Sequence, residues 1–345
     1  EVNIKIALNR EMIEGRLPFE QRNALLERMT DDVSSIVLED NRLQTLALSI
    51  AETGGAAALP SYVRLIETFE AEGRLDRVVE GLAANDELLR RAQDTRGLTR
   101  PELAVLLSTA KLGLQDAIEH GDLASDPSLS PELHAAFPPE MRKSFAKAID
   151  EHQLRGEIIA TKLANRIVNR MGLIDPFELA EEEGASLADI ATMFVTAERL
   201  FDIGKLWADI DAADMTEVGR LTLCELIAAG LRAQMADLLR TMPAGKLPGE
   251  MVDMLAPGIG RLGAKVNELL HDEGKRAAQA LAERLSAAGA PEGIAARIAR
   301  LFDMDGAIGL AALGARSGVT ETVLTNAFTT LGEALGLDWA QTTAL

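Results

Sequence analysis

The sequence has few cysteines, few aromatic residues and no long apolar segment, and each shortage narrows what the protein can be. Cys224 is the only cysteine among 345 residues, so no intrachain disulfide can form and nothing indicates an oxidising compartment. No apolar run approaches the ~20 residues that span a bilayer, and the first residues lack the basic and then apolar segments of a signal peptide. We therefore expect a cytoplasmic protein that does not contact membranes.

Positive charge is also scarce. The chain has 35 Lys and Arg residues against 54 Asp and Glu residues, which gives a net charge of −19. Sequence-independent affinity for nucleic acid comes mostly from Lys and Arg residues that displace counterions from phosphates, so a strongly acidic chain is repelled. We therefore predict no nucleic-acid partner.

The shortage of aromatic residues bears on the fold class. Hydrophobic residues make up 47% of the chain but Phe, Trp and Tyr only 3%, so the core is built from Ala, Leu, Ile, Val and Met. The unbranched members of this set favour helices, whereas sheets are enriched in aromatic and β-branched residues. We predict an all-α protein of many helices, packed in two or three helical subdomains.

Residues that begin and end helices recur along the chain. In LTRPELAVLL, Thr99, Pro101 and Glu102 combine a capping hydroxyl, a first-turn proline and an acid at the third helical position, which predicts a helix from about Arg100. Residues 2–8 (VNIKIAL) alternate like a strand but also fit a helix face, and the pattern alone does not decide. Glycines that can close a last helical turn predict helix ends at Gly121, Gly172, Gly184 and Gly230.

Two stretches interrupt the helical pattern. Residues 121–140 contain four prolines, and residues 242–263 contain three prolines and five glycines. Both compositions are typical of connections. We therefore predict subdomain boundaries in these stretches.

The residues that usually form metal or nucleophilic sites are too scattered to do so. The histidines, which are His120, His134, His152 and His271, do not have the HExxH spacing or pair with Cys224. Cys224 lies among apolar residues, where a thiol behaves as a small hydrophobic group. We assign no metal site and no catalytic residue.

Two partial motifs are interpreted as coincidences. Gly258, Gly260 and Gly263 spell G-x-G-x-x-G, but a dinucleotide fingerprint needs a strand before it, and MVDMLAP is not a convincing strand. Asp303 and Asp305 resemble the start of a calcium loop whose remaining oxygen ligands are missing, so we interpret them as part of a surface turn.

The most unusual segment is residues 150–171. Four basic residues fall within a wedge of about 80° on a helix, and most of the remaining circumference is apolar. Such a helix is enclosed on most sides, so its charges need partners. Two interpretations stay open: ion pairing within the chain, for example with the acids of residues 178–183, or contact with an anion or another domain. We call this set the basic stripe; it consists of Arg155, Lys162, Arg166 and Arg170.

Several long strings together resemble the large NAD-specific glutamate dehydrogenases of bacteria, in the order found in that family and over at least residues 1–215. They are EVNIKI from Glu1, NRLQTLALS from Asn41, LTRPELAVLLSTAK from Leu98, RGEIIATKLANRIVNRMG from Arg155 and FDIGKLWADID from Phe201, with a looser match in LGEALGLDW, which ends at Trp339. In this family a catalytic core oxidatively deaminates L-glutamate to 2-oxoglutarate and ammonia with NAD, and a helical C-terminal region follows it.

The resemblance implies a division of this chain. Residues 1–20 would form an exit helix at the end of the catalytic core, followed by helical subdomains at 21–125, 126–240 and 241–345. Catalytic and NAD-binding residues would lie elsewhere in the full-length enzyme, so we transfer none to this chain. The implied partners are the catalytic and N-terminal domains of the same polypeptide and further copies in a homo-oligomer.

The resemblance leaves the role of the region open. Our main hypothesis is a non-catalytic domain that supports oligomer assembly or restricts motion of the catalytic domain. The alternative is a regulatory module that binds a small anionic effector at the basic stripe, which requires different affinities for two states of the enzyme. A third possibility is an independent helical scaffold.

Overall fold

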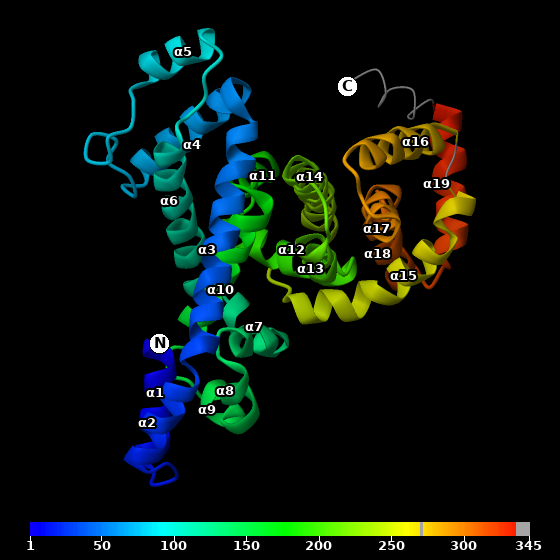
Figure 1. The fold of residues 1–345 in the computed structure, drawn as a ribbon. Helices are drawn as coiled ribbons and strands as arrows, with labels where there is room; N and C mark the ends of the chain where they lie inside the picture. Colours follow the sequence, from blue (N-terminus) through cyan, green and yellow to red (C-terminus); the bar gives the residue numbers. More distant parts are fainter. Residues whose placement is uncertain (270–271, 336–345) are drawn as a thin grey trace. The chain divides into compact units, whose positions relative to one another are not determined.

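The fold was examined in a computed structural model that describes residues 1–269 and 272–335. All regular structure in the described ranges is helical, which confirms the all-α prediction (Figure 1). The chain forms two compact units. The first contains residues 1–178 and 186–191, and the second contains residues 179–185 and the described part of 192–345. The finer subdomain boundaries stay predictions. Trp339, which ends the loosely matching string LGEALGLDW, lies outside the described residues.

The first unit contains six longer helices and several short ones before residue 172. The longer ones are α1 (Val2–Ile13), α2 (Phe19–Arg28), α3 (Thr30–Thr53), α4 (Leu59–Ala71), α6 (Arg100–Glu119) and α10 (Arg155–Met171). The short ones are η1 (Gly55–Ala58), α5 (Asn85–Gln93), η2 (Leu123–Ser125), η3 (Pro127–Leu129), α7 (Ser130–Ala135), α8 (Pro139–Ser144) and α9 (Ala146–Asp150).

Helix α10 is the centre of this unit. It packs against α6, α3 and α7, and Figure 1 shows α3 and α10 side by side. Its apolar positions recur at three and four residues, and Ile159, Leu163 and Ile167 are fully buried. Fully burying side chains of this size stabilises a fold by about 1.5–3 kcal/mol each, so α10 holds its neighbours together.

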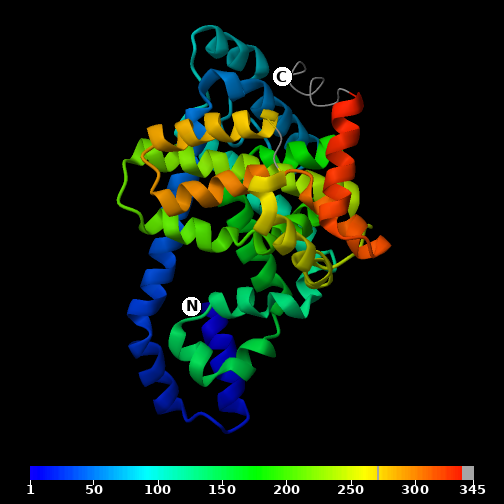
Figure 2. The same cartoon turned by 90° about the vertical axis from the view of Figure 1, so that its right-hand side faces the viewer.

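Helices α11 (Asp175–Glu183) and α12 (Leu187–Leu200) contribute residues to both units. The second unit continues with α13 (Ile203–Ala212), α14 (Glu217–Thr241), α15 (Pro248–Leu269), α16 (Asp272–Ala287), α17 (Glu292–Asp303), α18 (Ala307–Ser317) and α19 (Glu321–Leu335). Helix α14 packs against α17 and α18, and α15 packs against α18 and α19. Figure 2 shows α16 and α17 running side by side.

The helix starts and several helix ends agree with the sequence. Helix α6 begins at Arg100, and Glu102 accepts hydrogen bonds from the N–H (2.7 Å) and the hydroxyl (2.8 Å) of Thr99. The ambiguous residues 2–8 are helical. Gly172 and Gly184 follow the last residues of α10 and α11 with φ of 95° and 63°, as an end with positive φ requires, and Gly121 lies just beyond α6.

Two predictions from glycine and proline were wrong. Gly230 does not end a helix: it lies inside α14, where a Cβ would come within 2.6 Å of Leu301 Cδ2. Most of the stretch 242–263 is not irregular either, because α15 begins at Pro248 and contains Pro257. Gly230 on α14 and Gly258 on α15 each lie where another helix packs closely, against Leu301 and Ala311. Local composition cannot distinguish a glycine in such a contact from one that breaks a helix. Figure 1 shows that α15 curves along its length, as expected when a proline removes a helical hydrogen bond.

None of the helices in the described ranges combines the length and the apolar character that a membrane span needs.

Candidate functional site

The basic stripe lies on α10, and its strongest contact is an ion pair with α7. Both terminal nitrogens of Arg166 donate to the carboxylate of Glu132, at 3.0 and 3.2 Å. The two side chains are 31% and 13% exposed, so this bidentate pair is largely shielded from water. Paired donors from one guanidinium fix both the distance and the orientation of the two helices.

The other members of the stripe also have surroundings supplied by the first unit. Lys162 Nζ lies 3.3 Å from Asp40 Oδ1 on α3. Arg155 Nη1 donates to the carbonyl of Ala124 at 2.9 Å, and Arg170 is buried with 9% of its surface exposed. Within the chain, Arg166 and Lys162 thus meet carboxylates and Arg155 meets a backbone carbonyl, while a role of the stripe toward an anion or another domain stays a prediction.

The acids that follow α10 in the sequence have other partners. Glu178 pairs with Arg64, Glu182 with Arg232 and Glu183 with Arg240. The acidic partners of Lys162 and Arg166, which are Asp40 and Glu132, do not come from this segment. Distant helices supply them instead.

Lys111 on α6 is a cation whose environment the sequence did not indicate. Within the described residues its Nζ is buried and has no hydrogen-bond partner. Burial lowers the pKa of Lys111 to about 8, and the negative charge of Asp40 opposes this change. The first unit therefore contains one amine that is costly to keep charged.

The partial motifs noted in the sequence do not form sites. The G-x-G-x-x-G residues lie inside α15, with no strand before them, and a Cβ at Gly258 would lie 2.8 Å from Ala311 Cβ on α18. Cys224 is buried, 2% exposed. Among the residues that the structure describes, no cluster of His, Cys, Asp and Glu could hold a metal ion.

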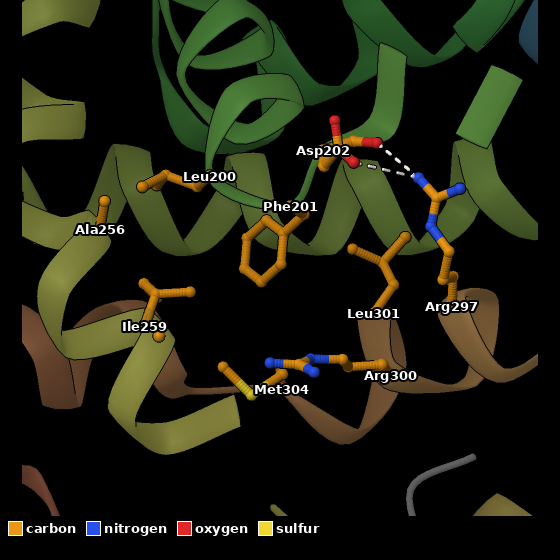
Figure 3. A pocket seen from close by; sticks show the side chains of 10 residues that line it. Leu200, Phe201, Asp202, Ala256, Ile259, Arg297, Arg300, Leu301 and Met304 are labelled. Carbon is orange, nitrogen blue, oxygen red and sulfur yellow. Dashed lines mark hydrogen bonds and ion pairs between the residues drawn. The ribbon is translucent and has the colours of Figure 1, made fainter. Parts of the chain in front are cut away.

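A hollow in the second unit is a candidate place for a ligand. It is formed by the turn between α12 and α13, by one face of α15 and by α17, and has a volume of about 290 Å³. We call it the α13–α17 hollow. Its apolar walls are Leu200, Phe201, Ala256, Ile259, Leu301 and Met304, and its charged residues are Asp202, Arg297 and Arg300 (Figure 3).

One edge of the hollow has an unusual backbone. Asp202 has a φ of 51°, the left-handed region that residues with a Cβ rarely adopt. Arg297 holds this turn: its Nη2 donates to the carbonyl of Asp202 at 2.9 Å and lies 3.4 Å from the carboxylate, and its Nη1 pairs with Asp209. Arg297 is therefore already engaged by the protein.

Arg300 differs from Arg297. It forms no side-chain hydrogen bond or ion pair with any residue in the described part of the chain. Its guanidinium lies against α15, where a Cβ at Gly263 would come within 2.8 Å of Arg300 Cζ. One feature of the sequence pointed to this hollow, the family-like string that begins at Phe201. Nothing in the sequence pointed to Arg300, because it comes close to Phe201 only through the packing of α17.

The fold and these sites define an all-helical protein of two units whose basic residues mainly join helices. Two family models match this chain. The family model described as "Glutamate dehydrogenase, C-terminal" matches residues 95–344, and the model described as "Bacterial NAD-glutamate dehydrogenase, catalytic domain" matches residues 1–51. The chain belongs to the glutamate dehydrogenase C-terminal family.

The chain is also similar to proteins named NAD-specific glutamate dehydrogenase. Those of Halomonas elongata and Pseudomonas aeruginosa are each 33% identical over 98% of this chain and 21% of their own length. That of Mycobacterium tuberculosis is 30% identical over 86% of this chain and 18% of its own length. The chain thus spans about a fifth of the relatives it matches.

Proposed function

We propose that this chain is the C-terminal part of an NAD-dependent glutamate dehydrogenase and that its helices support the catalytic domain without supplying reacting groups. The full-length enzyme would convert L-glutamate and NAD to 2-oxoglutarate, ammonia and NADH in the cytoplasm, in amino-acid catabolism. NAD would bind in a part of the catalytic domain that this chain does not include. The matching relatives carry the name of this activity, and the catalytic-domain model covers residues 1–51 here.

The contacts of α3 carry the proposal. Most of α3 lies in the segment that matches the catalytic domain, whereas α6 and α10 lie in the segment that matches the C-terminal family. Arg100 at the start of α6 donates to the carbonyl of Thr45 at 3.0 Å and to Ser49 Oγ at 3.3 Å, and it pairs with Glu52. Together with the Lys162 to Asp40 contact, these bonds attach the C-terminal segment to α3 at two points.

This arrangement gives the basic stripe a role as a contact between domains. A helix held along its length by charge-assisted bonds and buried apolar residues moves as one body with its neighbours. Motion of the end of the catalytic domain would therefore carry α6 and α10 with it. The catalytic and N-terminal domains, and further copies in a homo-oligomer, are the partners we propose.

The test compares two variants of the full-length enzyme. NADH formation from L-glutamate is measured, before and after heating, with Arg100→Ala and with Arg284→Ala. The second is a matched change at an exposed arginine of α16 whose side chain forms no hydrogen bond or ion pair with the described residues. We expect Arg100→Ala to lower activity or its resistance to heat by several-fold and Arg284→Ala to leave both unchanged. Equal behaviour of the two variants would refute the supporting role.

The non-catalytic part of the proposal has its own measurement. The purified 345-residue chain is assayed beside the full-length enzyme at equal molar concentration. We expect turnover only from the full-length enzyme, and NADH formation by the chain alone would overturn the assignment.

A further inference from the structure

We propose that the α13–α17 hollow binds a small monocarboxylate with an apolar body, the carboxylate pairing with Arg300. The hollow lies wholly within the second unit, on residues to which neither the family comparison nor the proposed supporting role assigns a part. The argument rests on the walls, the charge and the shape of the hollow.

The walls suit an apolar body. Phe201, Ile259, Leu301 and Met304 come from three separate elements and face one space, and Figure 3 shows the ring of Phe201 on the opposite side of this space from Arg300. Transfer of apolar groups from water to such a surface is favourable in proportion to the area buried. Ligand sites commonly combine such walls with a few polar groups that set orientation.

The charge of the hollow is opposite to that of the chain. Two arginines and one aspartate line it, whereas the whole chain carries a net charge of −19. Arg297 and Asp202 already interact with each other. The charge left over is that of Arg300, whose planar fork of N–H donors matches the two oxygens of a carboxylate.

Arg300 is exposed and lies close to α15 at the edge of the hollow. Its guanidinium lies against the backbone of α15 because Gly263 has no side chain to displace it. Arg297 likewise holds the left-handed turn at Asp202 that presents Phe201. Groups that are already placed lose little freedom on binding, which favours affinity.

The volume limits the ligand. Liquid water occupies roughly 30 Å³ per molecule, so about 290 Å³ holds on the order of ten non-hydrogen atoms. Hexanoate, with its short alkyl chain and single carboxylate, is the probe of this size. Hexan-1-ol and hexylammonium have the same alkyl chain without the negative charge.

The experiment is isothermal titration of the full-length protein with each of these three probes, and then with variants. Arg300→Gln removes the cation, with Arg284→Gln as the matched control. Gly260→Leu fills the hollow, because Gly260 lines it and a Cβ there would meet no atom within 4 Å; Gly293→Leu is its control, an exposed glycine of α17 that is equally open.

We expect saturable binding of hexanoate, at least about tenfold tighter than that of hexan-1-ol or hexylammonium, since only the carboxylate can form a charge-assisted pair with Arg300. Arg300→Gln and Gly260→Leu should each abolish this preference, while both controls keep it. Equal binding of the three probes, or hexanoate binding unchanged in Arg300→Gln or in Gly260→Leu, would overturn the proposal. Because the readout is binding heat and not turnover, failure here is distinct from failure of the supporting role.

Discussion

The two units hold their central helices in different ways. In the first unit α10 is joined to α7 and α3 by charged pairs, Arg166 with Glu132 and Lys162 with Asp40. In the second unit α14 and α15 also form charged pairs, Arg232 with Glu182 and Arg261 with Glu321. In addition they meet their neighbours at glycines: Gly230 faces Leu301 on α17, and Gly258 faces Ala311 on α18. Charged pairs act through long side chains and fix orientation, whereas glycines let backbones approach closely and increase van der Waals contact.

The packing of each unit bears on which basic side chains remain able to bind a ligand. In the first unit Arg166 and Lys162 of the basic stripe have acidic partners on other helices. Where glycines join helices, a nearby arginine need not pair, and Arg300 beside Gly263 is an example. The hollow suited to a ligand occurs in the unit whose helices also meet at glycines.

The largest effect is expected at Gly230, where a side chain would test whether glycine is needed for α14 to pack against α17. Leucine at this position would overlap Leu301, which is 2% exposed and cannot move aside easily. Overpacking of this kind costs typically 1–3 kcal/mol, and we expect about 3 kcal/mol for Gly230→Leu in urea unfolding followed by circular dichroism. Gly260→Leu, on a neighbouring helix with open space around it, is the control and should leave stability equal or slightly higher. Similar losses in the two variants would contradict the packing role of Gly230.

The next largest effect is expected at Lys111, where a substitution should raise the stability of the chain. The folded-state pKa of about 8 lies below the ordinary 10.5, so the unfolded chain binds more protons between these values and stability should rise with pH from about 8 to 10.5. Below pH 8 the full cost of the buried ammonium is present. We expect Lys111→Met to stabilise the chain by about 2 kcal/mol at pH 7 and to flatten this rise, measured by urea unfolding from pH 7 to 10.5. A variant that unfolds like the parent at every pH would show that the amine is well solvated.

A loss of stability of similar size to that gain is expected when the ion pair that joins α10 to α7 is broken. Arg166→Glu would place two carboxylates in a half-buried contact. Breaking exposed pairs costs ~1 kcal/mol or less and breaking buried pairs 3–5 kcal/mol, so we expect about 2 kcal/mol here. Arg90→Glu, which breaks an exposed pair with Glu87, is the matched control and should cost less. The exchange Arg166→Glu with Glu132→Arg should restore part of the loss, and failure of both results would count against pairing as the link between these helices.

The smallest effect is at the start of α6. Thr99→Ala removes the hydroxyl that contacts Glu102, and loss of a capping residue costs about 1 kcal/mol. Thr99→Ser keeps the hydroxyl and should retain most of the stability. Thermal unfolding of the three proteins distinguishes them, and an unchanged midpoint for Thr99→Ala would show that the capping box contributes little.

Features decided within a few residues could be predicted from the sequence. The helical class follows from an aliphatic core with few aromatic residues, and the start of α6 at Arg100 follows from a cap whose donors and acceptor lie three residues apart. The ends at Gly172 and Gly184 follow from the freedom of glycine to adopt positive φ. The family resemblance came from long strings, which composition and periodicity could not have supplied.

Features that depend on a distant helix could not be predicted. Gly230 and the glycines of α15 look the same in the sequence whether a helix ends there or another helix packs there, and only the position of Leu301 or Ala311 decides. Asp40 and Glu132 are 122 and 34 residues away from the cations they meet, so the partners of the basic stripe could not be read from neighbouring acids.

The sequence by itself determined that this is an acidic, helical chain of the glutamate dehydrogenase C-terminal family, because composition, caps and long matching strings are properties of consecutive residues. Only the tertiary structure decided which charges pair, which glycines face another helix and that Phe201 and Arg300 line one hollow. Those outcomes depend on how helices pack, and packing brings together residues whose separation along the chain carries no record of their contact.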